Sequence, residues 1–267
     1  MKVALIQLGY ADGEPVGDRV ARAASMVVAA AGHDLVVLPE LWAPTGFDYR
    51  TWAERAEPVD GAIASAMAAA AAEAGVVLHA GSIIERLPHA GVEGKHLANT
   101  SLVFGRDGGL VTAYRKIHRF GFAEGEPSLL EAGDEIVVTE LPVGGQVPVM
   151  AGISTCYDLR FPELYRQQVD LGATLFVIPA AWPLARIAHW SLLARARAVE
   201  DQCFVIACNT AGTHAGVTMG GHSVVVGPTG TVVAEADTEE QVLSVDLDLD
   251  EVRAARASFP VLADRRL

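Results

Sequence analysis

Three side chains that could take part in covalent or acid–base chemistry stand where apolar runs of the sequence end. Glu40 follows "LVVLP", Lys116 follows "LVTAYR" and Cys156 follows "VMAGIST". In α/β sheets, ligands collect beyond the carboxyl ends of the strands. A thiol at such a place could attack an acyl carbon, a carboxylate could accept its proton, and an ammonium could stabilise an oxyanion.

Cys156 has two opposed interpretations. Free cysteines are among the most buried and inert residues, so a core role is the ordinary expectation. However, the apolar run before Cys156 leads directly into a helical segment with Pro162 in its first turn. A sharp strand-to-helix turn exposes a nucleophile and directs backbone N–H groups at a reacting carbonyl, and a helix N-terminus favours the thiolate. Cys203 and Cys208, in a β-rich run, are predicted core residues.

Glu40 and Lys116 also have structural alternatives, since either could be a solvated charge at the end of a strand. The apolar neighbours of Glu40 indicate partial burial, which would raise the pKa of its carboxyl and suit it to act as a general base. A histidine is the usual base for a cysteine nucleophile. His118, His189 and His222 fall near predicted junctions, so the residues alone leave a Cys–His hydrolase open.

The elements that must position these side chains alternate between strands and helices. Short apolar runs predict strands at 3–8, 34–40, 76–83, 174–183 and 203–212, with further strands at 135–143, 147–156 and 241–249. Turn residues predict hairpins over 99–116 and 221–236, and loops fill 119–134. Helical patterns cover 18–31, opened by Asp18 as a cap, and 61–75, 161–172, 189–202 and 250–256.

This alternation predicts βαβ units in both halves of the chain. The runs "LVVLPELW" and "LFVIPAAW" are alike and hold similar places in their halves. They indicate two equivalent sheets packed together, with helices on the outside because purely apolar strands are buried on both faces. Without a linker or low-complexity tract, residues 1–267 are predicted to form a single domain.

Composition excludes several classes of function. The net charge of −13 and the pI of about 5.0 argue against a nucleic-acid-binding surface. Three cysteines without close pairing give no disulfide framework, and no metal-binding spacing is present. No apolar run has the length or the flanks of a signal peptide or a membrane helix. We therefore expect a cytoplasmic protein with no membrane partner and no metal.

The motifs "LPELW", "YRKIH" and "GISTCYDLRFPEL", in this order, resemble the nitrilase superfamily of carbon–nitrogen hydrolases. The segments "LLARARAVEDQCFVIACNTAG" and "GGHSVVVGPTG" are also typical of that family, so the resemblance covers essentially the whole chain. It implies an α/β fold, a four-layer α-β-β-α sandwich, and assembly into homodimers or larger homo-oligomers through the outer helices. No metal or organic cofactor is implied.

The resemblance also implies roles for residues. Glu40, Lys116 and Cys156 match a catalytic triad that works through a thioester, with the backbone N–H of Tyr157 at the oxyanion. A second glutamate assists in many members, and "GEPSLLEAGDE" points to Glu126, with Glu124 as the alternative.

The segment "CYDLRFPEL" stands where true nitrilases usually carry "CWE". This difference resembles amidase branches that act on small ω-amides such as 2-oxoglutaramate. Deaminated glutathione and N-carbamoyl compounds are alternative substrates, and a catalytically silent scaffold of the same fold is an alternative of another class. Trp182 and Phe122 are expected to wall the pocket. A substrate carboxylate could be bound by Arg160, Arg186 or Arg119, although a structural salt bridge is favoured for Arg160.

Overall fold

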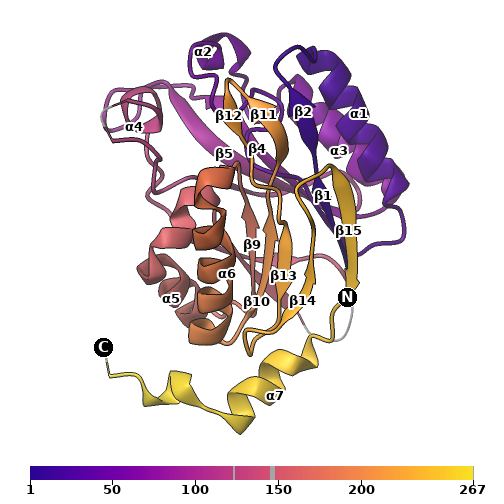
Figure 1. Cartoon of the computed structure of the whole chain (residues 1–267), viewed down its shortest axis with the longest axis vertical. Coiled ribbons are helices and arrows are strands. Elements are labelled where there is room, and N and C mark those ends of the chain that lie inside the picture. The colour runs from indigo at the N-terminus through magenta and orange to yellow at the C-terminus, as the bar shows by residue number, and fades with distance from the viewer. Residues whose placement is uncertain (123, 145–147, 267) are drawn as a thin grey trace.

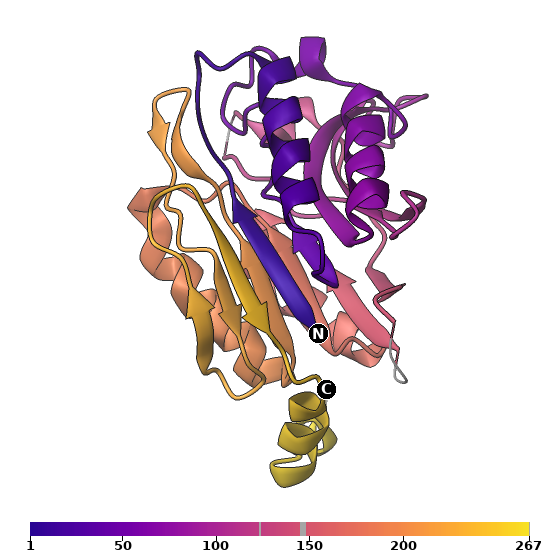
Figure 2. The ribbon, with the colours of Figure 1, turned by 90° about the vertical axis from the view of Figure 1, so that its right-hand side faces the viewer.

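Two six-stranded β-sheets pack face to face at the centre of the molecule (Figures 1 and 2). The computed structural model describes residues 1–122, 124–144 and 148–266. The first sheet consists of β1 (Lys2–Gln7), β3 (Leu35–Val37), β4 (Val77–Arg86), β5 (Leu97–Phe104), β6 (Leu110–Arg115) and β15 (Gln241–Asp246). The second consists of β7 (Val137–Leu141), β8 (Val149–Ile153), β9 (Leu175–Pro179), β10 (Phe204–Cys208), β13 (Val224–Val226) and β14 (Val232–Glu235).

Helices cover the outer face of each sheet. The helices α1 (Val16–Ala29) and α3 (Ala62–Ala74) pack on the first sheet, and α5 (Pro162–Asp170) and α6 (Ile187–Asp201) pack on the second. Between the sheets, Val and Ile side chains such as Val37 and Val177 form a third apolar core, because the inner face of each sheet is apolar. The predicted four-layer α-β-β-α sandwich is confirmed.

The two sheets have matching connectivity. The strands β1, β3 and β4 run parallel in the first sheet, as β8, β9 and β10 do in the second. An antiparallel hairpin then follows in each, β5-β6 in one and β13-β14 in the other. The look-alike runs form β3 and β9, and their ends meet across the sandwich, where the amide of Glu40 donates to the carbonyl of Ala180 (3.3 Å). The prediction of two equivalent sheets is therefore confirmed.

Several local predictions need correction. Helix α1 begins at Val16 after Pro15, so Asp18 lies in its first turn and is not the cap. The predicted strand 203–212 breaks after Cys208, and the chain then enters a small third sheet of β2 (Gly9–Ala11), β11 (Ala211–His214) and β12 (Val217–Thr218). These strands have two to four residues, which is too short for a clear periodic pattern.

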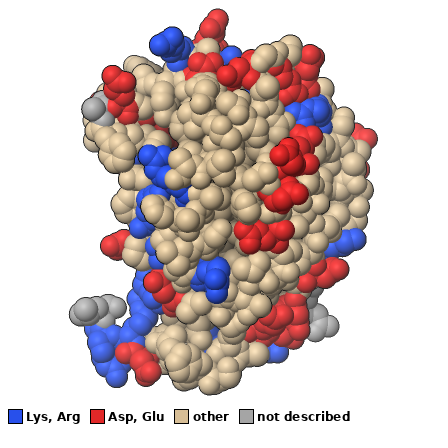
Figure 3. Space-filling view, in the orientation of Figure 1, with Lys and Arg blue, Asp and Glu red and all other residues tan. Residues whose placement is uncertain are grey.

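Shorter elements complete the fold. Helix α2 spans Trp52–Arg55, and α4 (Glu126–Leu129) lies within the stretch predicted as loop. Helix α7 (Asp250–Ser258) lies beyond one end of the sheets (Figure 1). Within the described ranges, no helix combines the length and the apolar character needed to cross a membrane. Figure 3 shows acidic side chains running down the side where β15 lies, with basic side chains more frequent on the side of α5 and α6.

Candidate active site

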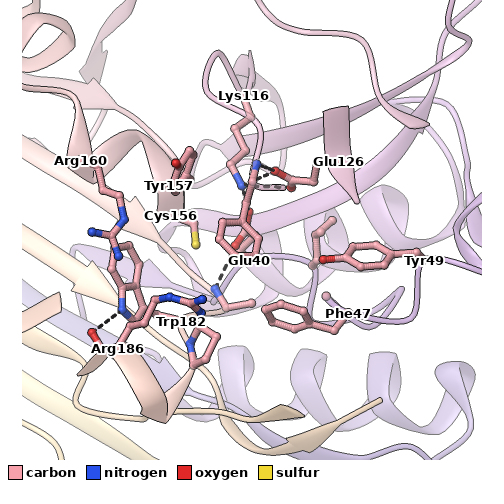
Figure 4. Close-up of a pocket in the computed structure, with 15 residues that line it drawn as sticks. Glu40, Phe47, Tyr49, Lys116, Glu126, Cys156, Tyr157, Arg160, Trp182 and Arg186 are labelled. Atoms are coloured by element: carbon pink, nitrogen blue, oxygen red, sulfur yellow. Dashed lines mark hydrogen bonds and ion pairs between the residues drawn. The ribbon is translucent and has the colours of Figure 1, made fainter. Parts of the chain in front are cut away.

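The three candidate residues at strand ends come together in one cavity, and Glu126 joins them (Figure 4). Glu40 follows β3, Lys116 follows β6, Cys156 follows β8, and Glu126 is the first residue of α4. The two sheets thus bring together residues that lie up to 116 positions apart, as 156 minus 40. Glu124, the alternative to Glu126, is exposed and does not line this cavity.

Lys116 connects the two glutamates. Its Nζ lies 2.7 Å from Oε1 of Glu40 and 3.0 and 2.9 Å from the two carboxylate oxygens of Glu126. Burial alone would lower the pKa of Lys116, but the carboxylates of Glu126 and Glu40 outweigh it and hold that pKa well above its ordinary value. The ammonium therefore keeps its charge in a site that excludes water.

The pKa of Glu126 is also raised, but for a carboxyl this shift favours the neutral form. Burial raises the pKa of its carboxyl, Lys116 opposes this shift, and the nearby charge of Glu40 adds to it. The amide of Phe120 also donates to Oε2 of Glu126. Burial, together with the charge of Glu40, thus makes protonation of Glu126 easier than in water.

Cys156 stands on a sharp turn, as predicted. Its φ is +50°, a left-handed value that is rare for a residue other than glycine. Two residues separate the end of β8 from a 3₁₀ helix, Cys156–Arg160, whose start is stabilised by a capping box between Thr155 and Asp158. The sequence predicted the sharp turn but not this 3₁₀ helix. Strained backbone of this kind is often found at functional sites.

The expected thiolate is not favoured here. Burial, and then the charge of Glu40, raise the pKa of the Cys156 thiol well above its ordinary value, although Lys116 opposes them. The prediction that the helix N-terminus would favour the thiolate is therefore wrong, because burial outweighs it. The thiol needs a base, and Figure 4 shows its sulfur pointing toward the Glu40 carboxylate.

Sequence reasoning missed Asn99, which is buried on β5. Its Nδ2 donates to Oε1 of Glu40 (2.8 Å) and to Oε1 of Glu126 (2.9 Å). We call Glu40, Asn99, Lys116 and Glu126 the inner cluster. A signal for Asn99 was present, because its place in the 99–116 hairpin puts it across from Lys116.

Asp158 ties the cysteine turn to the lysine loop. It accepts hydrogen bonds from the amide of Thr155 (2.9 Å) and the hydroxyl of Tyr114 (2.7 Å). Its other oxygen faces the amide of His118 (2.9 Å) and the Nδ1 of that residue (2.7 Å). His118 also stacks on Phe161, with ring centroids 3.7 Å apart. His118 is thus engaged with Asp158, and among the described residues no histidine lines the cavity.

Five aromatic side chains line the cavity: Phe47, Tyr49, Phe120, Tyr157 and Trp182. Trp182 lines the pocket as predicted, whereas Phe122 is 87% exposed and does not. Phe120 lines it instead, because its backbone is bound to Glu126 while Phe122 packs on the outer side of Phe120. Tyr157, whose N–H was expected at the oxyanion, follows Cys156 directly.

Two arginines reach the cavity without a carboxylate partner. Arg160 stacks on Trp182, with its Cζ 4.6 Å from the ring centroid, and Arg186 lies over Phe120 at 5.6 Å. Among the described residues, neither forms a salt bridge. The salt bridge favoured for Arg160 is therefore wrong. Arg119, the third candidate, is paired with Glu93 (2.8 Å) and does not line the cavity.

The chemistry available to this cavity is that of a thiol beside a carboxylate and an ammonium. Among the described residues, no group of three or more His, Cys, Asp or Glu side chains could hold a metal ion. A thiol can attack a carbonyl carbon, and the fixed ammonium can stabilise the oxyanion that forms.

Comparisons with known proteins agree with this chemistry. A family model described as carbon–nitrogen hydrolase matches residues 2–257. A 2-oxoglutaramate amidase of Paenarthrobacter nicotinovorans is 44% identical over 100% of this chain and 90% of its own length. Another, from Bacillus subtilis, is 34% identical over 99% and 97%. The crystal structure of Saccharomyces cerevisiae Nit3, a member of branch 10 of the nitrilase superfamily, has a TM-score of 0.85 and 31% identity, covering 100% of this chain and 97% of that one.

Proposed function

Since the chain belongs to the carbon–nitrogen hydrolase family, we propose that it is an ω-amidase, which hydrolyses the terminal amide of a small dicarboxylic acid monoamide such as 2-oxoglutaramate. The hydrolase class, acting on carbon–nitrogen bonds other than peptide bonds, agrees with the prediction made from the sequence. The observation that carries the proposal is one cavity with a thiol, a base and an ammonium at one place and two guanidinium groups without carboxylate partners at another. The 44% identity to a 2-oxoglutaramate amidase supports it.

The first half of the reaction forms a thioester. Glu40 takes the proton of Cys156, and the sulfur attacks the amide carbon of the substrate. The ammonium of Lys116 and the backbone N–H of Tyr157 stabilise the resulting oxyanion. When the C–N bond breaks, Glu40 returns its proton to the leaving nitrogen and ammonia departs.

The second half consumes water. Glu40 removes a proton from a water molecule, which attacks the thioester carbon while Glu126 helps to orient it. The C–S bond breaks and Cys156 recovers a proton from Glu40. One amide and one water thus give one carboxylic acid and one ammonia, without a metal or an organic cofactor in these steps.

Arg160 and Arg186 bind the distal carboxylate of the substrate. Each guanidinium is stacked on an aromatic ring, which fixes its plane while leaving its N–H groups for a ligand. Among the described residues, the polar side-chain partner of Arg160 is His189, whose Nδ1 lies 3.4 Å from the guanidinium. An amide without a carboxylate lacks this interaction, so it should be a poor substrate.

Ammonia release by the purified protein tests this proposal. The panel contains 2-oxoglutaramate, succinamate, glutaramate, deaminated glutathione, an N-carbamoyl amino acid and an aliphatic nitrile. We expect release from an ω-amide and none from Cys156→Ala. Release only from deaminated glutathione or the carbamoyl compound would establish an alternative substrate. No release from any of them by folded protein would favour the silent scaffold.

Variants of the arginines test the recognition of the substrate carboxylate. Arg160→Met and Arg186→Met should raise KM for an ω-amide about 10-fold or more, since a charge-assisted hydrogen bond contributes about 1.5–3 kcal/mol. Arg253→Met is the matched control, because its side chain is 78% exposed and pairs only with Asp250 on α7. Unchanged KM in both pocket variants would contradict the role of these arginines.

We also propose that the protein is a homodimer or a larger homo-oligomer through its outer helices. On α6, Leu192 is 65% exposed and Val199 is 50% exposed, which is costly for apolar side chains left in water. Light scattering after size-exclusion chromatography should give at least twice the mass of one chain. Leu192→Asp should shift that mass toward the monomer. The cytoplasmic location stays a prediction.

A further inference from the structure

The amide group of Asn99 uses both of its donors on carboxylates. A side-chain amide nitrogen carries two hydrogens, and Nδ2 of Asn99 gives one to Glu40 (2.8 Å) and one to Glu126 (2.9 Å). Each bond ends on Oε1, which is also the oxygen of Glu40 that Lys116 contacts. Asn99 therefore fixes the orientation of both carboxylates and leaves Oε2 of Glu40 facing the amide of Ala181 (2.9 Å).

The other end of this amide group is unsatisfied. Oδ1 of Asn99 is buried and has no hydrogen-bond partner among the described residues. A buried acceptor without a partner is costly, and such groups in native proteins are often found at functional sites. Turning the amide over would not help, because Oδ1 would then face two carboxylates. Stability alone does not account for an asparagine here.

Charge gives the reason for a neutral donor. The inner cluster holds two carboxylates and one ammonium, all buried. A second cation at position 99 would neutralise the cluster and weaken Glu40 as a proton acceptor. An apolar residue would leave the two carboxylates repelling each other. An amide holds them together and adds no charge.

We propose that Asn99 is a positioning residue of the hydrolysis: it holds Glu40 and Glu126 beside Lys116 and keeps one negative charge in excess, so that Glu40 can accept the proton of Cys156. This inference rests on the proposed function, in which Glu40 is the base. The backbone supports it, because the amide of Lys116 donates to the carbonyl of Asn99 (2.9 Å). This bond continues the β5–β6 pairing by one residue and places Lys116, directly after β6, opposite Asn99 on β5.

Two substitutions separate donation from packing. Asn99→Asp keeps the shape but loses the N–H groups, whereas Asn99→Ala loses the shape and the donors without adding charge. If Asn99 only fills space, Asn99→Asp should be the milder change. If it acts by donation, Asn99→Ala should lower kcat about 10- to 100-fold, and Asn99→Asp should lower it further. KM should change little, since Asn99 does not line the cavity.

The pH profile gives a readout that a purely structural role would not move. Loss of an N–H donor favours the protonated form of the carboxylate that accepted its hydrogen bond. The acid limb of kcat/KM in Asn99→Ala should therefore lie at higher pH than in the wild type. Among the described residues, Cys156, Tyr49 and Tyr10 are further acidic groups that interact with the cluster. Burial raises the pKa of each, that of Tyr49 to about 12, so all three stay protonated in this range.

Thr100→Val is the matched control. Thr100 is the next residue on β5, is equally buried, and donates to a glutamate outside the site, Glu85, at 2.6 Å. It should keep the wild-type kcat and the wild-type acid limb. Circular dichroism and thermal unfolding show whether each variant folds.

Alkylation of Cys156 by iodoacetamide, followed by mass spectrometry, needs no amide substrate. It therefore distinguishes failure of this inference from failure of the proposed function. Asn99→Ala, which adds no charge, should be alkylated about 10-fold more slowly than the wild type, since Glu40 is then no longer held in place as the base for the thiol. This result would support the role of Asn99 even if the wild type hydrolysed no amide in the panel.

The overturning results are specific. Alkylation of Asn99→Ala as fast as that of the wild type would overturn the proposal. So would an Asn99→Asp variant that loses less activity than Asn99→Ala, because shape and not donation would then matter. If Asn99→Asp does not fold, the acid limb of the kcat/KM profile of Asn99→Ala tests the proposal instead. A limb at higher pH supports the proposal, and a slower enzyme with an unmoved limb overturns it.

Discussion

The strands β5 and β6 carry a carboxylate cluster on each face. On the face toward the second sheet lies the inner cluster, with Asn99 opposite Lys116. On the other face, Thr100 stands opposite Arg115, and both bind Glu85. We call Thr100, Arg115 and Glu85 the outer cluster. Pleating sends successive side chains to opposite faces, so neighbouring residues serve two clusters of similar composition.

The two clusters differ in charge balance and in access to water. In the outer cluster one carboxylate meets one guanidinium through two bonds of 2.8 and 2.7 Å, and the side chain of Arg115 is 50% exposed. In the inner cluster two carboxylates share one buried ammonium. A balanced, partly solvated ion pair has no group that is ready to accept a proton. An unbalanced, buried cluster holds a site for a proton, which catalysis requires.

Removal of the only cation in the inner cluster should give the largest effect. Lys116→Met should lower kcat by about 10²–10³ or more, because an oxyanion donor is lost. It should also lower the free energy of unfolding by about 3–5 kcal/mol at neutral pH, since two buried carboxylates lose their partner. Ammonia release and urea denaturation measure these effects. If the free energy of unfolding of Lys116→Met equalled that of the wild type, the two clusters would not differ in their dependence on a buried cation.

A pH-dependent effect should follow from Glu126. Its folded-state pKa lies above the unfolded value, so it contributes stability below pH 4.5 that is lost as pH rises through the folded value. Glu126→Gln has no carboxyl to titrate, so the variant does not lose this stability as the pH rises. Relative to the wild type, the variant should gain about 1.4 kcal/mol for each unit of the pKa difference. Thermal unfolding from pH 4 to 8 measures it, and a constant difference across that range would contradict the raised pKa.

The outer cluster should respond in stability but not in activity. Arg115→Met leaves the buried Glu85 with only the Thr100 hydroxyl, which should lower the free energy of unfolding by about 1–3 kcal/mol. Water reaches this position, so the loss should be smaller than in Lys116→Met. Ammonia release should stay at the wild-type rate, and a large fall in kcat would show that the two clusters are coupled.

The smallest effect is expected when both charges of the outer cluster are removed. Adding Glu85→Gln to Arg115→Met should recover most of the lost stability, to within about 1 kcal/mol of the wild type, since no uncompensated charge remains. Urea denaturation of the wild type, the two single variants and the double variant completes a double-mutant cycle, which gives the interaction energy of the pair. Purely additive losses would show that the pair does not interact.

Local sequence patterns were sufficient for part of this description. The apolar runs and turn residues predicted most strands and helices, and three motifs predicted which residues would meet. Two kinds of feature were missed. The strands of the third sheet are too short to carry a pattern. Asn99 lies inside an ordinary β-rich run, and the one signal for it was its hairpin position opposite Lys116.

The sequence by itself determined most of the elements and the family, and it predicted that Glu40, Lys116, Cys156 and Glu126 would share one site, because period, turn chemistry and motif order are local properties of the chain. Only the tertiary structure decided their states. It raised the pKa of the Cys156 thiol by burial, left Arg160 without a carboxylate partner and turned Phe122 away from the cavity. These outcomes depend on which groups from distant segments surround a side chain and on how much water remains there, and both arise only when the two sheets pack together.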